Sequence, residues 1–219
     1  MNYEDKNSEY FTYVRKDLVS LIELEKNLKI LEVGAGFGHT LNYLKQTGVA
    51  SEGVGLDIFE DISRIAEYQR IDRFIFGNIE DIELSEYKNY FDLILLGDVL
   101  EHLIEPATVL DKLKTYLNQD GEILVSMPNI RHYSTFIKIF IKGNFDYEES
   151  GIFDYTHRRF FCKKNIKSLL ETNFRIINEI SSIHFYKNRS GAKILNKFTF
   201  GLFEQFLTVQ YFYKAVKKT

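Results

Sequence analysis

The chain has 219 residues, 45% of them hydrophobic and 27% charged, with a formal net charge of −3. This composition indicates one globular domain with a sizeable core, and the slight acidity disfavours a nucleic-acid binder, which usually carries a basic face. A single cysteine (Cys162), no secretory signal and no stretch of about 18 apolar residues predict a soluble cytoplasmic protein without a transmembrane segment.

Hydrophobic periodicity predicts alternating helices and strands in the first part of the chain. The predicted helices are 10–25, 37–46 and one that begins near Pro106, and the predicted strands are 29–33, 53–58, 73–79, 91–99 and 122–128. The strand at 91–99 is apolar throughout its centre, which is typical of a parallel strand buried on both faces. The pattern therefore predicts an α/β protein with a mostly parallel sheet.

The alternation weakens after residue 129. We expect a helix over 130–142, a loop over 143–161, a helix over 163–172, and strands at 174–187 and 207–217. The last two strands would suit an antiparallel pair at the C-terminal edge of the sheet.

Polar or glycine residues follow four predicted strands at regular spacing. Gly38, Asp57, Asn78 and Asp98 are separated by 19, 21 and 20 residues. In an open α/β sheet the carboxyl ends of the strands meet at one edge, where ligands bind. The spacing predicts one shared ligand site. As local alternatives, Asp57 could cap a following helix and Asn78 could be a turn residue.

The first strand ends in the sequence ILEVGAGFGHT, residues 30–40. A dinucleotide site needs a glycine at position 39, where this chain has His39, so an NAD-dependent oxidoreductase is disfavoured. The acidic Glu32 would repel a pyrophosphate and instead suits a ligand with a positive centre, such as an amino-acid ammonium group.

These motifs, over about residues 28–129, resemble the class I S-adenosylmethionine (SAM) dependent methyltransferases. The resemblance implies a Rossmann-like, seven-stranded sheet with helices on both faces, and SAM as cofactor with S-adenosylhomocysteine as product. The cofactor-binding residues that it implies are Glu32, Gly34, Gly36, Asp57, Ile58, Asn78, Ile79, Gly97 and Asp98. Tyr10, Tyr13 or Arg15 of the N-terminal helix could reach the methionine carboxylate.

Histidine is the natural base for a hydroxyl acceptor, because its ordinary pKa is about 6.5. His102 lies in GDVLEHL, just after the fourth strand. This stretch resembles quinone-type and some RNA-end methyltransferases, in which two carboxylates and a histidine hold Mg²⁺. The matching residues would be Asp98, Glu101 and His102. Asp98 is shorter than the usual glutamate, and the same Glu-His pair occurs in many metal-free relatives, so bound Mg²⁺ is disfavoured although it stays open.

A second polar cluster lies in GIFDYTHRRFF, residues 151–161, and is preceded by SMPNIRHYS, residues 126–134. Both stretches resemble methyltransferases associated with bacterial surface-polysaccharide (capsule or O-antigen) biosynthesis. The resemblance favours His157 as the base, oriented by Asp154, with His102 as the other candidate. Arg131, His132 and Arg158 would bind the acceptor. Alternatively, Asp154 and Arg158 only stabilise the loop and His157 is a hydrogen-bonded strut.

The sequence as a whole predicts one methyltransferase domain over 1–219. Its parts would be an N-terminal helical cap (1–27), a cofactor-binding core (28–129), a substrate-covering insertion (130–173) and C-terminal edge strands (174–219). The predicted reaction is O-methylation of a sugar, a nucleotide-linked sugar or a phosphoryl-type substituent destined for a cell-surface glycan. Two alternatives stay open: a quinone or small-aromatic O-methyltransferase, and a SAM-binding protein without catalysis.

Overall fold

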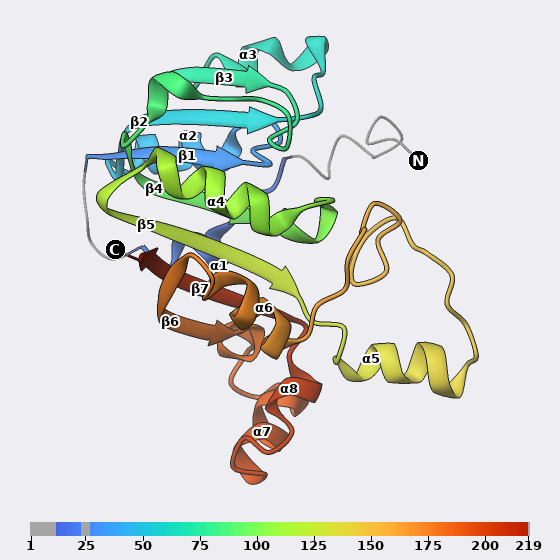
Figure 1. Cartoon of the computed structure of the whole chain (residues 1–219). Coiled ribbons are helices and arrows are strands. Elements are labelled where there is room, and N and C mark those ends of the chain that lie inside the picture. The colour runs from blue at the N-terminus through green and yellow to red at the C-terminus, as the bar shows by residue number, and fades with distance from the viewer. Residues whose placement is uncertain (1–11, 23–26, 219) are drawn as a thin grey trace.

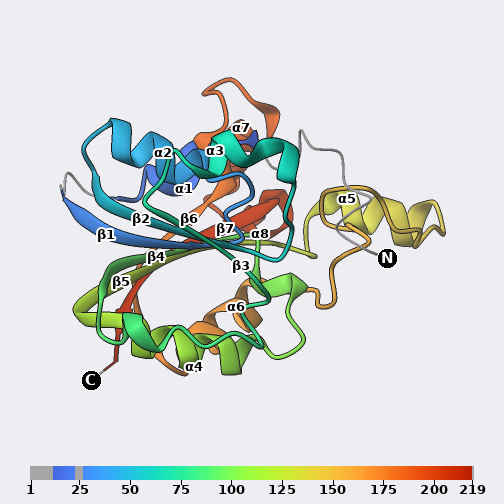
Figure 2. The same cartoon turned by 90° about the horizontal axis from the view of Figure 1, so that it is seen from above.

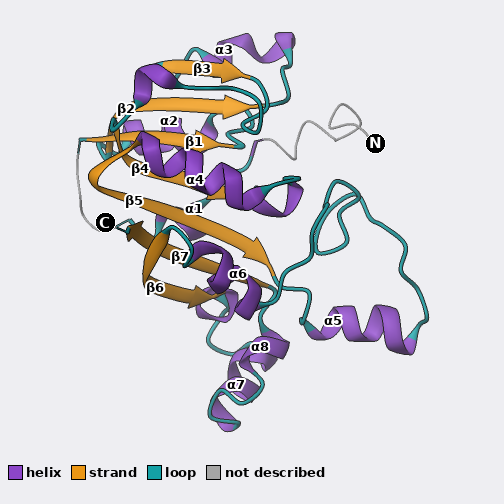
Figure 3. Cartoon of the chain, in the orientation of Figure 1, coloured by secondary structure: helices purple, strands orange, loops and turns teal. Residues whose placement is uncertain are grey.

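The strands form one seven-stranded sheet (Figures 1 and 3). The computed structural model describes residues 12–22 and 27–218. Across the sheet the order is β3 (Arg73–Phe76), β2 (Ala50–Asp57), β1 (Leu28–Val33), β4 (Phe91–Gly97), β5 (Leu117–Pro128), β7 (Gln210–Lys217) and β6 (Phe174–Ser181). Neighbouring strands are parallel except that β7 is antiparallel to both β5 and β6. The predicted α/β sheet with an antiparallel C-terminal edge is confirmed.

Helices cover both faces of the sheet (Figure 2). α1 (Lys16–Val19) and α2 (His39–Gln46) lie on one face, and α4 (Pro106–Tyr116) and α6 (Lys163–Leu170) lie on the other. The shorter or peripheral helices are α3 (Ile65–Tyr68), α5 (Tyr133–Phe136), α7 (Gly191–Phe198) and α8 (Glu204–Leu207). No helix of the described residues is long and apolar enough to cross a membrane.

β4 divides its side chains between two hydrophobic cores. Leu93 and Leu95 join the core beneath α1 and α2, whereas Ile94 and Leu96 join the core beneath α4 and α6. Successive side chains of a strand point to opposite faces, so a strand covered on both sides must be apolar at every position. The rigid centre of the sheet fixes the carboxyl ends of β1, β2 and β4 side by side.

Several predicted boundaries differ from the structure. The strand predicted at 174–187 ends at Ser181 and continues as a short 3₁₀ turn, Ser182–Phe185. Helices α7 and α8 precede β7, although the sequence was expected to enter a strand at 207. The helix predicted at 130–142 is divided into α5 and a π-helical turn, Ile137–Ile141. Of the helix predicted at 10–25, residues 10–11 and 23–25 lie outside the described residues.

Candidate active site

Three glycines turn the chain from β1 into α2. Gly34, Gly36 and Gly38 have φ angles of 72°, 54° and 76°, a left-handed conformation that other residues rarely adopt. A Cβ atom on Gly34 would also lie only 2.7 Å from Cγ2 of Val99. Backbone conformation therefore requires these glycines, and Gly34 and Gly36 line a cavity that opens beside them.

The cavity lies at the carboxyl ends of β1, β2 and β4 and has a volume of about 470 Å³, which suits a ligand of nucleoside size. All nine residues predicted to bind the cofactor line it: Glu32, Gly34, Gly36, Asp57, Ile58, Asn78, Ile79, Gly97 and Asp98. His102 and Arg158 line it as well. Five predicted site residues are not among its lining: Glu101, Arg131, His132, Asp154 and His157.

Glu32 presents a carboxyl group to the cavity. The side chain is only 5% exposed, and its Oε2 atom has no hydrogen-bond partner among the described residues. Burial raises the pKa of Glu32 to about 8, against the opposing effect of the Thr40 hydroxyl. A buried acceptor without a partner is costly unless a ligand satisfies it, so this oxygen fits a cationic hydrogen-bond donor.

Asp57 holds the glycine loop in place from the end of β2. Its Oδ2 accepts from the Gly36 amide at 2.8 Å and its Oδ1 accepts from the Phe59 amide at 2.9 Å. Burial raises the pKa of Asp57 to about 6. The neighbouring Ile58 is 54% exposed although it lines the cavity, which leaves an apolar surface for a flat ring.

Asn78 forms a tight turn after β3, as the local alternative predicted. Its Oδ1 accepts from the Glu80 amide and its Nδ2 donates to Asp81, both at 3.0 Å. The turn places Ile79, which is 3% exposed, in the cavity wall. Asn78 is therefore both a turn residue and a residue of the cavity wall.

Asp98 is the centre of a polar network at the end of β4. Its Oδ2 lies 3.0 Å from Nη1 of Arg15, and its Oδ1 accepts from the Ser126 hydroxyl at 2.9 Å and from Nε2 of Gln210. Arg15 also donates to Ser126 Oγ at 2.8 Å. The network joins the N-terminal segment, β4, β5 and β7 at the cavity. Asp98 itself has a left-handed backbone conformation, with a φ of 57°.

His102 is held by a chain of hydrogen bonds. Its Nδ1 lies 3.2 Å from the Thr156 carbonyl oxygen and 3.0 Å from Thr156 Oγ1, which donates to Asp154 Oδ1 at 2.6 Å. A carbonyl oxygen can only accept, so Nδ1 carries the proton and Nε2 keeps its lone pair. Burial, and then the neighbouring His157, lower the pKa of His102 to about 4, so the ring is neutral at physiological pH.

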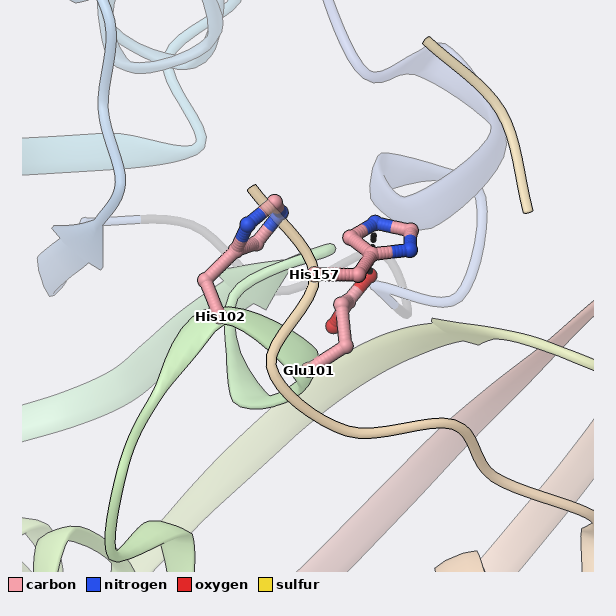
Figure 4. Close-up of side chains that lie close together, drawn as sticks. All are labelled: Glu101, His102 and His157. Atoms are coloured by element: carbon pink, nitrogen blue, oxygen red, sulfur yellow. Dashed lines mark ion pairs between the residues drawn. The ribbon is translucent and has the colours of Figure 1, made fainter. Parts of the chain in front are cut away.

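Glu101, His102 and His157 form a buried cluster (Figure 4). Nε2 of His157 lies 3.9 Å from Oε1 of Glu101, and Nδ1 of His157 donates to the Ile152 carbonyl at 3.0 Å. Glu101 is fully buried, and neither carboxylate oxygen has a hydrogen-bond partner among the described residues. Burial and the nearby Asp98 raise the pKa of Glu101 well above its ordinary value.

The cluster has donor atoms that fit a divalent ion. One ligand atom from each of the three side chains lies within 4.8 Å of the others, and both Nδ1 atoms are fixed by carbonyl oxygens, as is usual for metal-bound histidines. The set differs from the one predicted: His157 joins Glu101 and His102, whereas Asp98 is held by Arg15, Ser126 and Gln210.

Arg131 and His132 lie away from the cavity, at the start of α5. Arg131 Nη1 donates to Oε1 of Gln205 at 2.9 Å. His132 caps α5, its Nδ1 lying 2.7 Å from Ser134 Oγ. Of the predicted acceptor ligands, only Arg158 lines the cavity, and its side chain is exposed.

The methyltransferase domain family model matches residues 7–179, most of the chain. The chain belongs to the class I SAM-dependent methyltransferases. It is 19% identical over 177 residues to the ubiquinone biosynthesis O-methyltransferase of Aeromonas salmonicida, covering 79% of this chain and 71% of that one. Three further ubiquinone biosynthesis O-methyltransferases are matched over only 53% to 61% of their length.

Solved methyltransferases share the fold at low sequence identity. A SAM-dependent methyltransferase from Archaeoglobus fulgidus has a TM-score of 0.62 and 17% identity, with 97% of this chain and 95% of that one covered. One from Mesorhizobium loti has a TM-score of 0.60 and 15% identity, with 97% and 99% covered. The methyltransferase fold therefore spans nearly the whole chain, and SAM is its cofactor.

Sequence reasoning missed several residues of the methyltransferase site. Ser126 and Gln210 hold Asp98 from strands that are distant in sequence; Ser126 begins the recognised stretch 126–134 but was given no role, and no local motif distinguishes Gln210. Thr156 stood inside a recognised polar cluster, but its bond to His102 depends on how the 143–161 loop folds over β4. Arg15 was one of three candidates in the N-terminal segment, and Tyr10 lies outside the described residues.

Proposed function

We propose that this methyltransferase transfers the methyl group of SAM to a hydroxyl group of a small acceptor, with His102 as the general base. The hydrogen-bonded chain from His102 through Thr156 to Asp154 carries this proposal, because it fixes a neutral imidazole in the cavity wall. A histidine whose ring is oriented by a hydroxyl and a carboxylate is suited to removing a proton from the acceptor.

The proposed position of SAM follows from the charges of the cavity. The unpartnered Oε2 of Glu32 would accept from the methionine ammonium group, and Arg15 would face the methionine carboxylate. Asp57 would accept from the ribose hydroxyls, and Ile58 and Ile79 would pack against the adenine. These roles put the methyl group near Gly97 and Asp98.

The proposed reaction is an in-line displacement. The bond from the methyl carbon to the acceptor oxygen forms as the carbon–sulfur bond breaks, S-adenosylhomocysteine leaves, and the hydroxyl proton passes to Nε2 of His102. Correct positioning can supply about 7–11 kcal/mol, and a placed base contributes about 10²–10⁴-fold. The chain's own residues therefore have two tasks, alignment and proton removal.

Arg158 favours an acceptor with an anionic group. Its exposed guanidinium lies at the cavity and could bind a carboxylate or phosphate through two hydrogen bonds. We propose a sugar, a nucleotide-linked sugar or a phosphoryl-type substituent of a cell-surface glycan, with the segment 130–173 covering it. Arg131 and His132 would touch only an acceptor that extends beyond the cavity toward α5.

A second candidate is metal-assisted O-methylation of a small aromatic acceptor, such as a quinone precursor. Glu101 favours it, because this buried carboxyl has no hydrogen-bond partner within residues 12–22 and 27–218 and lies beside His102 and His157. When bound, a divalent ion would lower the pKa of an acceptor hydroxyl. The names of the matched ubiquinone biosynthesis O-methyltransferases point the same way.

Calorimetric titration and a turnover assay test the proposal together. SAM and S-adenosylhomocysteine should bind at micromolar concentration and NAD should not, and Asp57→Ala should weaken the binding of both sulfur ligands. Methylation of sugar phosphates without added metal, lost in His102→Ala, would support the main proposal. Turnover of catechols only with Mn²⁺ or Mg²⁺ would support the second candidate. SAM binding without turnover on any acceptor would contradict both.

A further inference from the structure

Two segments at the same end of the molecule expose large apolar side chains. They are 129–145, which includes α5, and 182–203, which includes α7 (Figure 1). Together they contain 13 of the 21 large hydrophobic residues exposed among the described residues. The most exposed are Phe140 (72%), Ile141 (68%), Phe198 (79%), Phe200 (98%) and Leu202 (81%). Concentrated apolar exposure of this kind marks an interaction surface.

Aromatic contacts connect the first segment to α8, which directly follows the second segment in sequence. Phe206 lies with its ring centroid 6.2 Å from that of Tyr133 and 6.3 Å from that of Phe136, and Phe136 stacks on Phe140 at 5.3 Å. A left-handed turn at Phe200 and Gly201, with φ angles of 50° and 81°, holds the almost fully exposed Phe200 outward. We call the surface made by residues 129–145 and 182–203 the docking face.

The docking face is basic in a protein that is acidic overall. It contains seven of the 28 Lys and Arg residues and none of the 31 Asp and Glu residues. Lys142, Lys187, Arg189 and Lys197 are exposed and form no ion pair among the residues that the structure describes. The remainder of the chain is correspondingly acidic, so the charge is segregated.

α7 combines both properties. Ile194, Leu195 and Phe198 are exposed on it, and the exposed Lys197 lies between Leu195 and Phe198 in sequence. Amphipathic helices of this composition lie in the plane of a bilayer, with aromatic and aliphatic side chains inserted and lysines at the anionic headgroups. A two-fold pairing of two copies through this face would instead oppose like charges.

We propose that the docking face binds the surface of an anionic lipid bilayer, with α7 and the α5 segment lying at the interface. The docking face is linked to the cavity through α8 and the start of β7: Gln205 of α8 accepts a hydrogen bond from Arg131, and Gln210, just after α8, donates to Asp98. Binding would hold the cavity close to the membrane, where a lipid-linked acceptor would be presented. The lipid binding itself does not depend on the identity of the acceptor.

Flotation with vesicles tests this proposal. The full chain is mixed with vesicles of phosphatidylcholine alone or of phosphatidylcholine and phosphatidylglycerol in equal parts, at 50 and 500 mM NaCl. We expect flotation with the anionic vesicles at low salt and little with the neutral ones. Each basic residue near an anionic surface contributes about five-fold in affinity, so Lys187→Glu/Lys197→Glu should lose at least about 25-fold.

Arg70→Glu/Lys88→Glu reverses two exposed cations elsewhere and should bind like wild type. Phe198→Ser/Phe200→Ser removes the apolar part and should also reduce flotation. Unchanged SAM binding by all variants would show that they are folded. Wild-type flotation that is absent, or equal in Lys187→Glu/Lys197→Glu, would overturn the proposal. A dimer that Phe198→Ser/Phe200→Ser dissociates, without lipid binding, would overturn it in favour of a second copy.

Discussion

Nη1 of Arg15 lies 3.0 Å from Oδ2 of Asp98, at the point where the methionine end of SAM is expected. The pair neutralises two charges in a largely enclosed place, since only 15% of the Arg15 side chain is exposed. Arg15 comes from the N-terminal segment and Asp98 from the end of β4. The ion pair therefore holds the N-terminal segment against the cavity. SAM binding would have to share or rearrange this contact.

Gly97 permits the approach of Arg15, and Gly97→Ala tests how much it matters. A Cβ atom there would lie 2.8 Å from Nη1 of Arg15, so the guanidinium must move away from Asp98. We expect the Kd for SAM to rise about ten-fold, the cost of roughly one disturbed charged hydrogen bond. Calorimetric titration measures it. Gly191→Ala is the control, since a Cβ atom there meets nothing within 4 Å, and equal effects in both variants would contradict the steric argument.

The raised pKa of Glu32 predicts a pH dependence of cofactor binding. With a pKa of about 8, Glu32 is protonated at pH 7 in the free protein, and an ammonium ligand would favour the ionised form. SAM binding should therefore release a proton and strengthen as pH rises from 6 to 8. Calorimetry in buffers with different ionisation enthalpies measures that proton. Glu32→Gln should bind more weakly and without proton release; release that persists in this variant would assign it to another group.

Glu32 also makes the free energy of unfolding depend on pH, and its raised pKa determines whether stability rises or falls with pH. The pKa of Glu32 is higher in the folded chain than the ordinary value of 4.5. The protonated side chain therefore contributes most to the free energy of unfolding below about pH 4.5, and this contribution is lost as pH rises through about 8. Glu32→Gln should therefore lose less free energy of unfolding than wild type between pH 5 and pH 8. Urea unfolding at these two pH values measures the difference, and parallel losses in both proteins would contradict the assignment.

The sheet could be predicted from the sequence because each core strand has a local pattern of its own, either a run of apolar residues or a polar or glycine residue at its end. The continuous apolar run of β4 and the glycines after β1 follow from burial and backbone conformation, which are local. Helix α7 was not predicted because it is short and lies on the surface. None of its residues is buried, so no helical spacing of buried apolar residues is required there. The site divides in the same way: the nine residues predicted to bind the cofactor lie at or just after the carboxyl ends of strands, whereas Gln210 reaches Asp98 only through sheet topology.

His102 and Thr156 give the most direct test of the proposed base. His102→Ala should lower kcat by about 10²–10⁴-fold and leave the Kd for SAM unchanged, since only proton removal is lost. His184→Ala, at an exposed histidine, is the matched control. Methylation of the best acceptor under saturating SAM measures kcat. A variant His102→Ala with wild-type kcat would leave positioning alone as the source of catalysis.

Thr156 acts through His102 and is expected to be a positioning residue. Thr156→Val removes the hydroxyl that links Nδ1 of His102 to Asp154 and keeps the carbonyl that also holds Nδ1. We expect kcat to fall about ten-fold with the KM for SAM unchanged, and Thr156→Ser to restore it. Because the pKa of His102 is about 4, the wild-type kcat should be flat between pH 5.5 and 8. Loss of activity in Thr156→Ser as well would indicate a packing role.

Glu101 is a fully buried carboxyl whose oxygens accept no hydrogen bond from the described part of the chain, and that arrangement should lower stability. Burying an unsatisfied polar group costs about 1–3 kcal/mol, which a thioether of similar length does not. Glu101→Met should therefore raise the Tm in the presence of EDTA, and under the metal-assisted candidate it should also lower turnover, as expected of a residue retained for function. Mn²⁺ should raise the Tm of wild type and leave that of Glu101→Met unchanged if the cluster holds an ion. A lower Tm for Glu101→Met in EDTA would show that Glu101 is a structural residue.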